Sequence, residues 1–164
     1  NGNPLFLQSI KTVSDEIRTI IEKRGIKNCT LFSYDKNGGY GNGDHLVVHK
    51  VGRLLFEDLS AHSLLFETTI PRDVYLRWFE KNKNCVSESY LPKLNYWSTE
   101  FGLKNDEIDY SYLLSPTKTK LKKKALSKHV SQIKNTEFPL SLTNADFMEL
   151  FGREYFAYVD RSIL

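Results

Sequence analysis

Cysteine is scarce in this chain, and long hydrophobic runs are absent from it. The 164 residues include two cysteines, Cys29 and Cys85, which are too few for a disulfide framework or for a zinc site of their own. No apolar run approaches the roughly 18 residues that a membrane-spanning helix needs, and no secretory leader is visible. We therefore expect no membrane partner and a cytoplasmic location, or a nuclear one in a eukaryote.

No established catalytic or cofactor motif is present either. The stretch DKNGGYGNGD at 35–44 holds four of the nine glycines, but it lacks the Gly-Lys-Ser/Thr ending of a phosphate-binding loop. Its composition is typical of a flexible hairpin connection. The nearby side chains with metal-binding atoms show no known ligand spacing, so the sequence predicts neither a cofactor nor a metal site; these side chains are Asp44, His45, His49 and His62.

The composition that is present belongs to a folded globular protein. Hydrophobic residues make up 40% of the chain and aromatic residues 13%, well away from the composition of disordered segments. A chain of this length is most simply one domain, with no linker or repeat that would divide it. The chain begins Asn-Gly-Asn without a Met, which leaves open a piece of a larger protein.

Hydrophobic periodicity predicts an α+β domain. An amphipathic helix over 4–24 opens the chain, and a mixed or antiparallel sheet of about five to seven strands follows. The other expected helices are 72–81 and a short one capped by Thr143. Alternating or apolar runs predict the strands, which are expected at 28–34, 45–57, 63–70, 137–142 and from Arg153 to the end of the chain.

One segment is strongly basic. Residues 110–136 contain seven lysines and no acidic residue, whereas the remainder of the chain has 16 basic and 20 acidic residues. Ser115 and Pro116 are typical of a helix start, and an amphipathic helix is predicted over 116–134. Leu126, Val130 and Ile133 would form its apolar side. The opposite arc would carry Lys120, Lys123, Lys124, Lys128 and Lys134.

The first turns of this basic helix combine several unfavourable features. Lysines crowd its amino end, where the helix dipole disfavours positive charge, and several lie four residues apart and repel. The sequence therefore predicts a stable helix from Ala125 to Ile133. Residues 116–124 are expected to be mobile unless an anionic ligand holds them, or the acidic residues Asp106, Glu107 and Asp109 do so.

The charge asymmetry predicts a non-catalytic nucleic-acid-binding domain. Lysines along one helix face neutralise phosphates and release counterions without reading the base sequence. Tyr110 and Tyr112 could stack on exposed bases of a single strand. The expected partner is DNA or RNA, together with other domains if the chain is part of a larger protein, and the oligomeric state stays open.

Two alternatives stand beside nucleic-acid binding. If residues 45–57 form a strand, His45 and His49 project from one face about 13 Å apart, at a rise of about 3.3 Å per residue. They could then flank a scissile phosphate with Arg53 stabilising its charge, as in a small metal-independent nuclease or toxin-like enzyme. The second alternative is a protein-interaction module that docks acidic partners on the lysine face.

Overall fold

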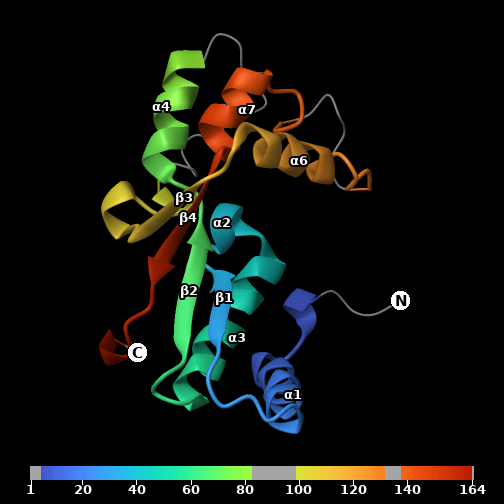
Figure 1. Cartoon of the computed structure of the whole chain (residues 1–164), viewed down its shortest axis with the longest axis vertical. Helices are drawn as coiled ribbons and strands as arrows, with labels where there is room; N and C mark the ends of the chain where they lie inside the picture. Colours follow the sequence, from blue (N-terminus) through green and yellow to red (C-terminus); the bar gives the residue numbers. More distant parts are fainter. Residues whose placement is uncertain (1–4, 83–98, 132–137, 164) are drawn as a thin grey trace. The chain divides into compact units, whose positions relative to one another are not determined.

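The computed structural model describes residues 5–82, 99–131 and 138–163. Within these residues the protein is α+β, as predicted, with six α-helices and one four-stranded sheet rather than five to seven strands. The chain divides into two compact units (Figure 1). Unit 1 comprises Asn1–Tyr110 and Tyr155–Leu164, and unit 2 comprises Ser111–Glu154.

The sheet is mixed. Its strands lie in the order β1 (Thr30–Tyr34), β2 (Leu64–Thr69), β4 (Arg153–Tyr158) and β3 (Tyr110–Leu113). β1 and β2 are parallel, and β4 runs antiparallel to β2. Because β1 and β2 are parallel, their carboxyl ends meet at one edge of the sheet, which is where open α/β sheets bind their ligands.

In unit 1, the helices α3 (Gly43–Asp58) and α1 (Ile10–Lys23) cover one face of this sheet. The other helical segments of unit 1 are η1 (Leu5–Leu7), α2 (Gly38–Gly41), α4 (Arg72–Asn82), η3 (Asn105–Glu107) and η4 (Arg161–Ile163). α3 lies against β1 and β2, and α1 packs on α3. α1 begins at Ile10 after a Ser9 cap, later than the predicted start at residue 4, and Gly25 with φ +64° follows its end.

The predicted strand over 45–57 is wrong, because these residues form most of α3. Val47, Val51 and Leu55 follow one another at a spacing of four residues and are all buried, where they contact apolar side chains of α1. The side chain of Asn42 caps the helix by accepting from the backbone N–H groups of Asp44 and His45. The β-branched valines favoured a strand, but the cap and the buried face give a helix.

Gly52 allows α3 to approach β1 closely. A Cβ atom at this position would lie 2.7 Å from the Ser33 Oγ atom of β1. The same Ser33 hydroxyl donates to the Val48 carbonyl of α3 over 2.9 Å. The closeness of helix and strand therefore depends on a residue without a side chain.

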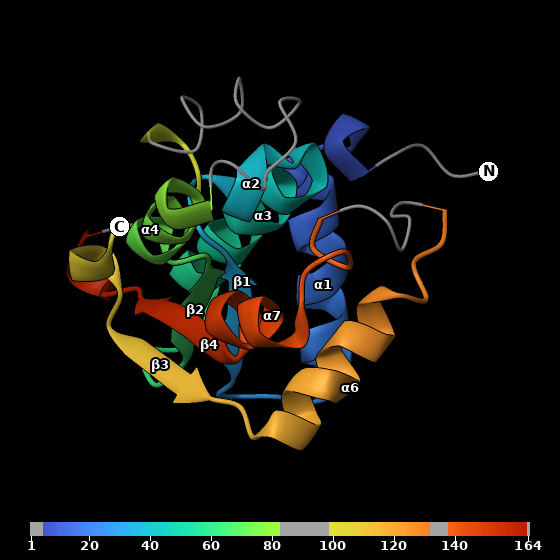
Figure 2. The same ribbon diagram turned by 90° about the horizontal axis from the view of Figure 1, so that it is seen from above.

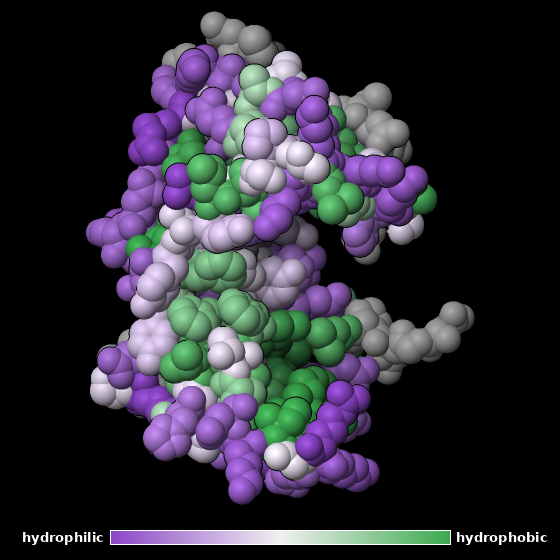
Figure 3. Space-filling view, in the orientation of Figure 1, coloured by the Kyte–Doolittle hydropathy of each residue, from purple (hydrophilic) through white to green (hydrophobic). Residues whose placement is uncertain are grey.

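The opposite face of the sheet in unit 1 carries exposed aromatic rings. Phe32 of β1 is 65% exposed, and its ring centroid lies 5.7 Å from those of Phe66 and Phe156. Tyr110 and Tyr158 also contact Phe66. Figure 3 shows hydrophobic side chains gathered over β1 and β2.

Unit 2 contains the helices α6 (Pro116–Leu126) and α7 (Asn144–Phe151), which lie side by side (Figure 2). Both starts follow the predicted caps. The Ser115 hydroxyl accepts from Lys118 N, and the Thr143 hydroxyl accepts from Asp146 N. Thr119 is buried and returns a hydrogen bond to the Ser115 carbonyl.

The predicted bounds of the stable part of the basic helix, Ala125 to Ile133, are wrong. Residues 116–124, expected to be mobile, form most of α6, and the helix ends at Leu126. Val130, expected on the apolar side, lies beyond the helix and is 78% exposed. Ile133 and Lys134 lie outside the described residues. The first turn is ordered because Pro116 and the Ser115 cap suit a helix start, and these local terms outweigh tenths of a kcal/mol of lysine repulsion.

The expected strand over 137–142 is also wrong in its described part. Residues 138–142 form a turn in which the Leu142 N–H donates to the Pro139 carbonyl. The final strand was predicted correctly in kind and is the shorter β4.

Candidate functional site

The glycine-rich loop after β1 is organised by a buried carboxylate. Asp35 Oδ1 accepts from the backbone N–H groups of Asn37 and Gly39, over 2.8 and 3.1 Å. Its other oxygen, Oδ2, accepts from the Thr69 hydroxyl at the end of β2 over 2.5 Å. The loop is therefore a built structure that joins the carboxyl ends of β1 and β2, and not a flexible hairpin connection.

The segment 101–103 holds this loop from the other side. The Gly102 N–H donates to the Gly39 carbonyl over 2.6 Å, and the Gly102 carbonyl accepts from the Asn37 amide over 2.7 Å. Buried Arg72 donates to the carbonyls of Phe101 and Gly102 over 2.7 and 2.9 Å. These contacts link the loop to the start of α4, so the edge of the sheet carries a fixed framework.

The amino end of α3 brings His45 to this loop. The Nδ1 atom of His45 lies 3.1 Å from the Gly38 carbonyl oxygen. A carbonyl oxygen can only accept, so Nδ1 carries the proton and Nε2 has the free lone pair. In the part of the chain that the structure describes, Nε2 has no hydrogen-bond partner.

Two tyrosines fix the orientation of the His45 ring. The Tyr34 ring is stacked on it, with ring centroids 3.7 Å apart and planes 5° apart, and Tyr40 meets it edge-on at 5.2 Å. Burial, with a smaller contribution from Tyr40, raises the pKa of Tyr34, so its phenol stays neutral beside the imidazole. Tyr40 is 51% exposed, and its ring is therefore accessible to a ligand.

The nuclease hypothesis expected His45, His49 and Arg53 to form one site. The structure separates His45 from the other two residues. His49 lies one helical turn from His45, and its Nδ1 atom lies 3.0 Å from the Tyr34 carbonyl and 3.1 Å from Glu67 Oε1. Arg53 Nε donates to the same carboxylate oxygen over 2.7 Å. Arg53 thus forms an ion pair with buried Glu67, and His49 contacts the same carboxylate beneath the helix.

The charge on Glu67 is stabilised by these two partners. Burial raises the pKa of Glu67, but hydrogen bonds from His49 and Arg53, together with their charges, outweigh burial and hold the pKa below its ordinary value of 4.5. Glu67 was not anticipated as a functional or structural centre, because only the tertiary structure places α3 over β2.

The lysines of α6 divide into anchored and free groups. Lys122 pairs with Glu154 over 2.8 Å, Lys123 donates to the Leu142 carbonyl over 2.6 Å, and Lys118 donates to the Tyr112 hydroxyl over 3.2 Å. Exposed Lys120, Lys124 and Lys128 have no hydrogen-bond or ion-pair partner within residues 5–82, 99–131 and 138–163. The predicted continuous row of phosphate-binding lysines is therefore partly used by the fold of unit 2.

Two of the acidic residues before β3, Glu107 and Asp109, have partners within unit 1. Glu107 accepts from Lys36 Nζ over 2.6 Å and from the Lys104 N–H over 2.9 Å, and these contacts lower its pKa. Asp109 accepts from the Tyr158 N–H over 2.7 Å. The order of α6 thus comes from its own caps.

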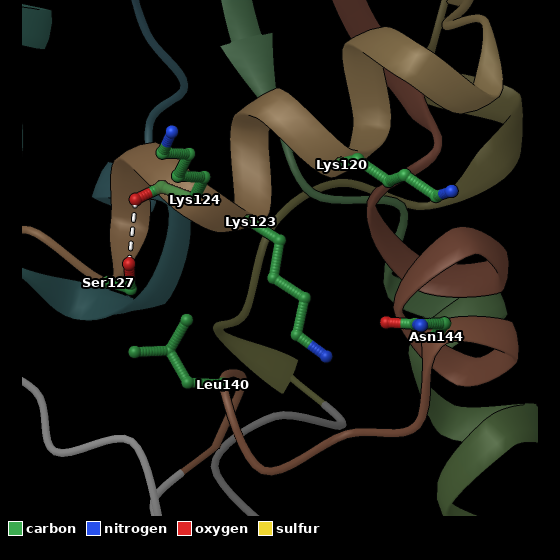
Figure 4. A pocket seen from close by; sticks show the side chains of 6 residues that line it. All are labelled: Lys120, Lys123, Lys124, Ser127, Leu140 and Asn144. Carbon is green, nitrogen blue, oxygen red and sulfur yellow. Dashed lines mark hydrogen bonds between the residues drawn. The ribbon is translucent and has the colours of Figure 1, made fainter.

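A cavity of about 400 Å³ lies beside α6 within unit 2. It is lined by Lys120, Lys123, Lys124, Ser127, Leu140 and Asn144 (Figure 4). The sequence predicted that the three lysines lie on one helix face. It did not indicate that α7 and the turn at 138–142 form the other walls of a cavity.

Among the described residues, no group of three or more His, Cys, Asp or Glu side chains could hold a metal ion. His45 Nε2 could serve as one metal ligand, since metal-binding histidines commonly donate their other ring nitrogen to a carbonyl. None of the helices in the described ranges is long and apolar enough to cross a membrane. Comparisons with protein-family models and with curated proteins find no match to this chain.

Proposed function

We propose that unit 1 carries a hydrolytic active site at the carboxyl ends of β1 and β2, with Nε2 of His45 as its reacting atom. The observation that carries this proposal is the 3.1 Å contact between Nδ1 of His45 and the Gly38 carbonyl oxygen, from which we infer that the proton of the neutral ring is on Nδ1. The stacked Tyr34 ring holds the imidazole in place. A histidine whose orientation and free lone pair are both determined meets the geometric requirement for a proton acceptor in catalysis.

The position of His45 supports the same proposal. Ligands of open sheets with parallel strands bind outside the carboxyl ends of those strands, and Asp35 and the glycine-rich loop lie at that edge in unit 1. In the proposed reaction Nε2 accepts a proton from the attacking water. The exposed ring of Tyr40 suits a substrate with a sugar or base ring, on which it can stack.

A nuclease is one form of this proposal, but with His45 as the reacting histidine and without His49 and Arg53. His49 and Arg53 are bound to Glu67, so His45 acts without them. Phosphodiesters of RNA and DNA therefore belong to the substrate panel, together with esters and amides of compounds that contain a sugar ring.

The test compares His45→Asn with His49→Asn. An asparagine side chain can reproduce the Nδ1 hydrogen bond of histidine but has no equivalent of Nε2, so each variant can keep this hydrogen bond while it loses Nε2 and the aromatic ring. We expect His45→Asn to lower hydrolysis by about 10²-fold or more, and His49→Asn to act mainly on stability. Each assay is run with a chelator and with added Zn²⁺ or Mg²⁺, because a metal ion could also bind Nε2. Unchanged hydrolysis by His45→Asn would remove the proposal.

A second candidate function is nucleic-acid binding through α6, supported by the exposed and unpaired Lys120, Lys124 and Lys128. Phosphate contacts by these lysines would make the affinity fall steeply with salt. The test titrates a labelled duplex and a single strand at several salt concentrations, with the triple charge reversal to Glu as the variant. Binding that the reversal leaves intact would exclude this candidate. Binding to an acidic protein but not to nucleic acid would favour the interaction-module alternative.

A further inference from the structure

The described residues that line the cavity beside α6 all belong to unit 2, and the cavity is widely open to solvent. Its volume of about 400 Å³ falls in the range of about 300–1,000 Å³ that is usual for ligand pockets. Three of its six lining residues are lysines, and the described residues of its lining include no carboxylate. Charge and shape therefore coincide here, whereas an exposed lysine row alone would indicate no particular ligand.

Lys123 is held in the centre of this cavity. Its ammonium group donates to the Leu142 carbonyl over 2.6 Å and lies 5.2 Å from the centroid of the Phe147 ring. Figure 4 shows the side chain extending between Leu140 and Asn144. An ammonium group has three donors, so Lys123 can bind a ligand without leaving the Leu142 carbonyl.

The amino end of α7 forms a second wall. Asn144 is the first residue of this helix, where backbone N–H groups lack helical partners and the helix dipole favours negative charge. In Figure 4, Lys120 lies on the same side of the cavity as Asn144, whereas Lys124 extends away from the centre of the cavity. The Thr143 hydroxyl binds Asp146, so one carboxylate is already present at this helix end, though outside the cavity lining.

We propose that this cavity binds a compact dianionic group, namely phosphate carried by an organic molecule. Lys120 and Lys123 supply two positive charges, the amide of Asn144 supplies a hydrogen-bond donor, and the Ser127 hydroxyl is already donated to the Lys124 carbonyl. Buried Leu140 gives the cavity an apolar wall that suits the organic part of a phosphate ester. The phosphate can belong to a free small molecule or to the end of a nucleic acid strand.

The first experiment titrates the full chain with pyrophosphate at 0.15 M salt, a concentration that screens exposed charges beyond about 8 Å. Calorimetry gives the affinity, and ¹H–¹⁵N NMR follows the Asn144 backbone amide. We expect Lys120→Gln to weaken binding about 10-fold or more, as for the loss of a charge-assisted hydrogen bond. The control Lys128→Gln removes the same charge from the same segment outside the cavity and should change affinity less than about 2-fold.

Asn144→Asp is the second variant. An acidic residue suits a helix amino end, so this variant should keep or raise the melting temperature while it repels the anion from the cavity. Loss of pyrophosphate binding without loss of stability supports the proposal. No saturable binding below about 10 mM, or equal weakening by Lys120→Gln and Lys128→Gln, would overturn it.

A last pair of titrations distinguishes the sources of the phosphate. An oligonucleotide with a 5′-phosphate is compared with the same strand without it. Tighter binding of the phosphorylated strand, lost in Lys120→Gln, identifies a strand end as a ligand of the cavity. If pyrophosphate binds at the cavity and the two strands bind equally, the ligand is a small phosphate ester. If the two strands bind equally and pyrophosphate does not bind at all, the cavity proposal is contradicted. His45→Asn should leave the pyrophosphate affinity unchanged, so this proposal and the hydrolytic proposal fail separately.

Discussion

The two units of this protein use their charged residues differently. Unit 2 has eight of the 23 basic and four of the 20 acidic residues, a net charge of +4, which leaves 15 basic and 16 acidic residues and a net charge of −1 in unit 1. In unit 1 the carboxylates of Asp35 and Glu67 are buried and hydrogen-bonded. In unit 2 the ammonium groups of Lys120, Lys124 and Lys128 remain exposed.

Unit 2 has an excess of positive charge, whereas unit 1 has a histidine side chain that its neighbours hold in one orientation. The lysines of unit 2 are evident in the sequence, because seven of them fall in one short segment. The oriented histidine of unit 1 depends on the Gly38 carbonyl and the Tyr34 ring, and net charge gives no sign of it. A surplus of charge indicates a class of partner, whereas chemistry requires a side chain that is held in place.

The largest expected effect on stability comes from Gly102 in unit 1. Its φ is +52°, and an added Cβ atom would lie 1.9 Å from the Ile70 carbonyl oxygen. That oxygen accepts from the Leu103 N–H, so the clash must disrupt the segment that holds the glycine-rich loop. Gly102→Ala should lower the free energy of unfolding by about 3–4 kcal/mol, as measured by urea denaturation.

Gly152 in unit 2 is the matched comparison for Gly102. Its φ of −76° is compatible with alanine, although a Cβ atom would lie 2.3 Å from the Met148 carbonyl. Gly152→Ala should therefore cost about 1–3 kcal/mol. An equal cost at the two glycines would show that the framework around the loop in unit 1 is not unusually constrained.

The next prediction concerns one glutamate in each unit. Glu67→Gln in unit 1 should lower the free energy of unfolding by about 1.5–3 kcal/mol at pH 7, because a buried carboxylate that is paired with Arg53 and hydrogen-bonded to His49 is replaced by a neutral amide. Glu154→Gln in unit 2 breaks a partly exposed pair with Lys122 and should cost about 1 kcal/mol or less. Urea titrations of both variants measure the difference.

The effect of Glu67 should depend on pH. The pKa of Glu67 in the folded protein lies below its ordinary value of 4.5, so its contribution to stability is present above that value and is lost as the pH falls through the folded pKa. The gap between wild type and Glu67→Gln should accordingly shrink in acid. A gap that stays constant from pH 7 to about pH 3 would mean that Glu67 is not charged in the folded protein.

A small effect is also expected at the start of α6. Ser115→Ala removes the acceptor for Lys118 N and should cost about 1 kcal/mol. Hydrogen exchange should show amides of 120–126 more protected than those of 128–131, because the helix ends at Leu126. Stronger protection of 128–131 than of 120–126 would instead support the prediction of a mobile basic segment that becomes ordered when an anion binds.

Local signals in the sequence identified most of the elements. The spacing of apolar residues predicted α1 and α4, and the Ser115 and Thr143 caps marked the starts of α6 and α7. The strand assigned to 45–57 shows where such signals conflict. Val47, Val51 and Leu55 also have helical spacing, and Asn42 is a strong cap, so greater weight on the cap than on valine preference would have predicted α3.

The candidate site could be predicted only in part. His45 was selected as a candidate, but its grouping with His49 and Arg53 followed from the wrong element. The partners that separate these residues, Glu67 and the Gly38 carbonyl, are supplied by β2 and by the glycine-rich loop. Contacts between segments distant in sequence depend on topology, which one sequence without relatives does not determine.

The tautomer of His45 tests the central claim most directly. Long-range ¹H–¹⁵N NMR on the full chain at about pH 8, where an ordinary imidazole is neutral, distinguishes protonated from unprotonated ring nitrogens. The account predicts a protonated Nδ1 and an unprotonated Nε2 in His45, with the Nε2 resonance unchanged in His49→Asn. A proton on Nε2 of His45 would leave no lone pair for catalysis and would contradict the account.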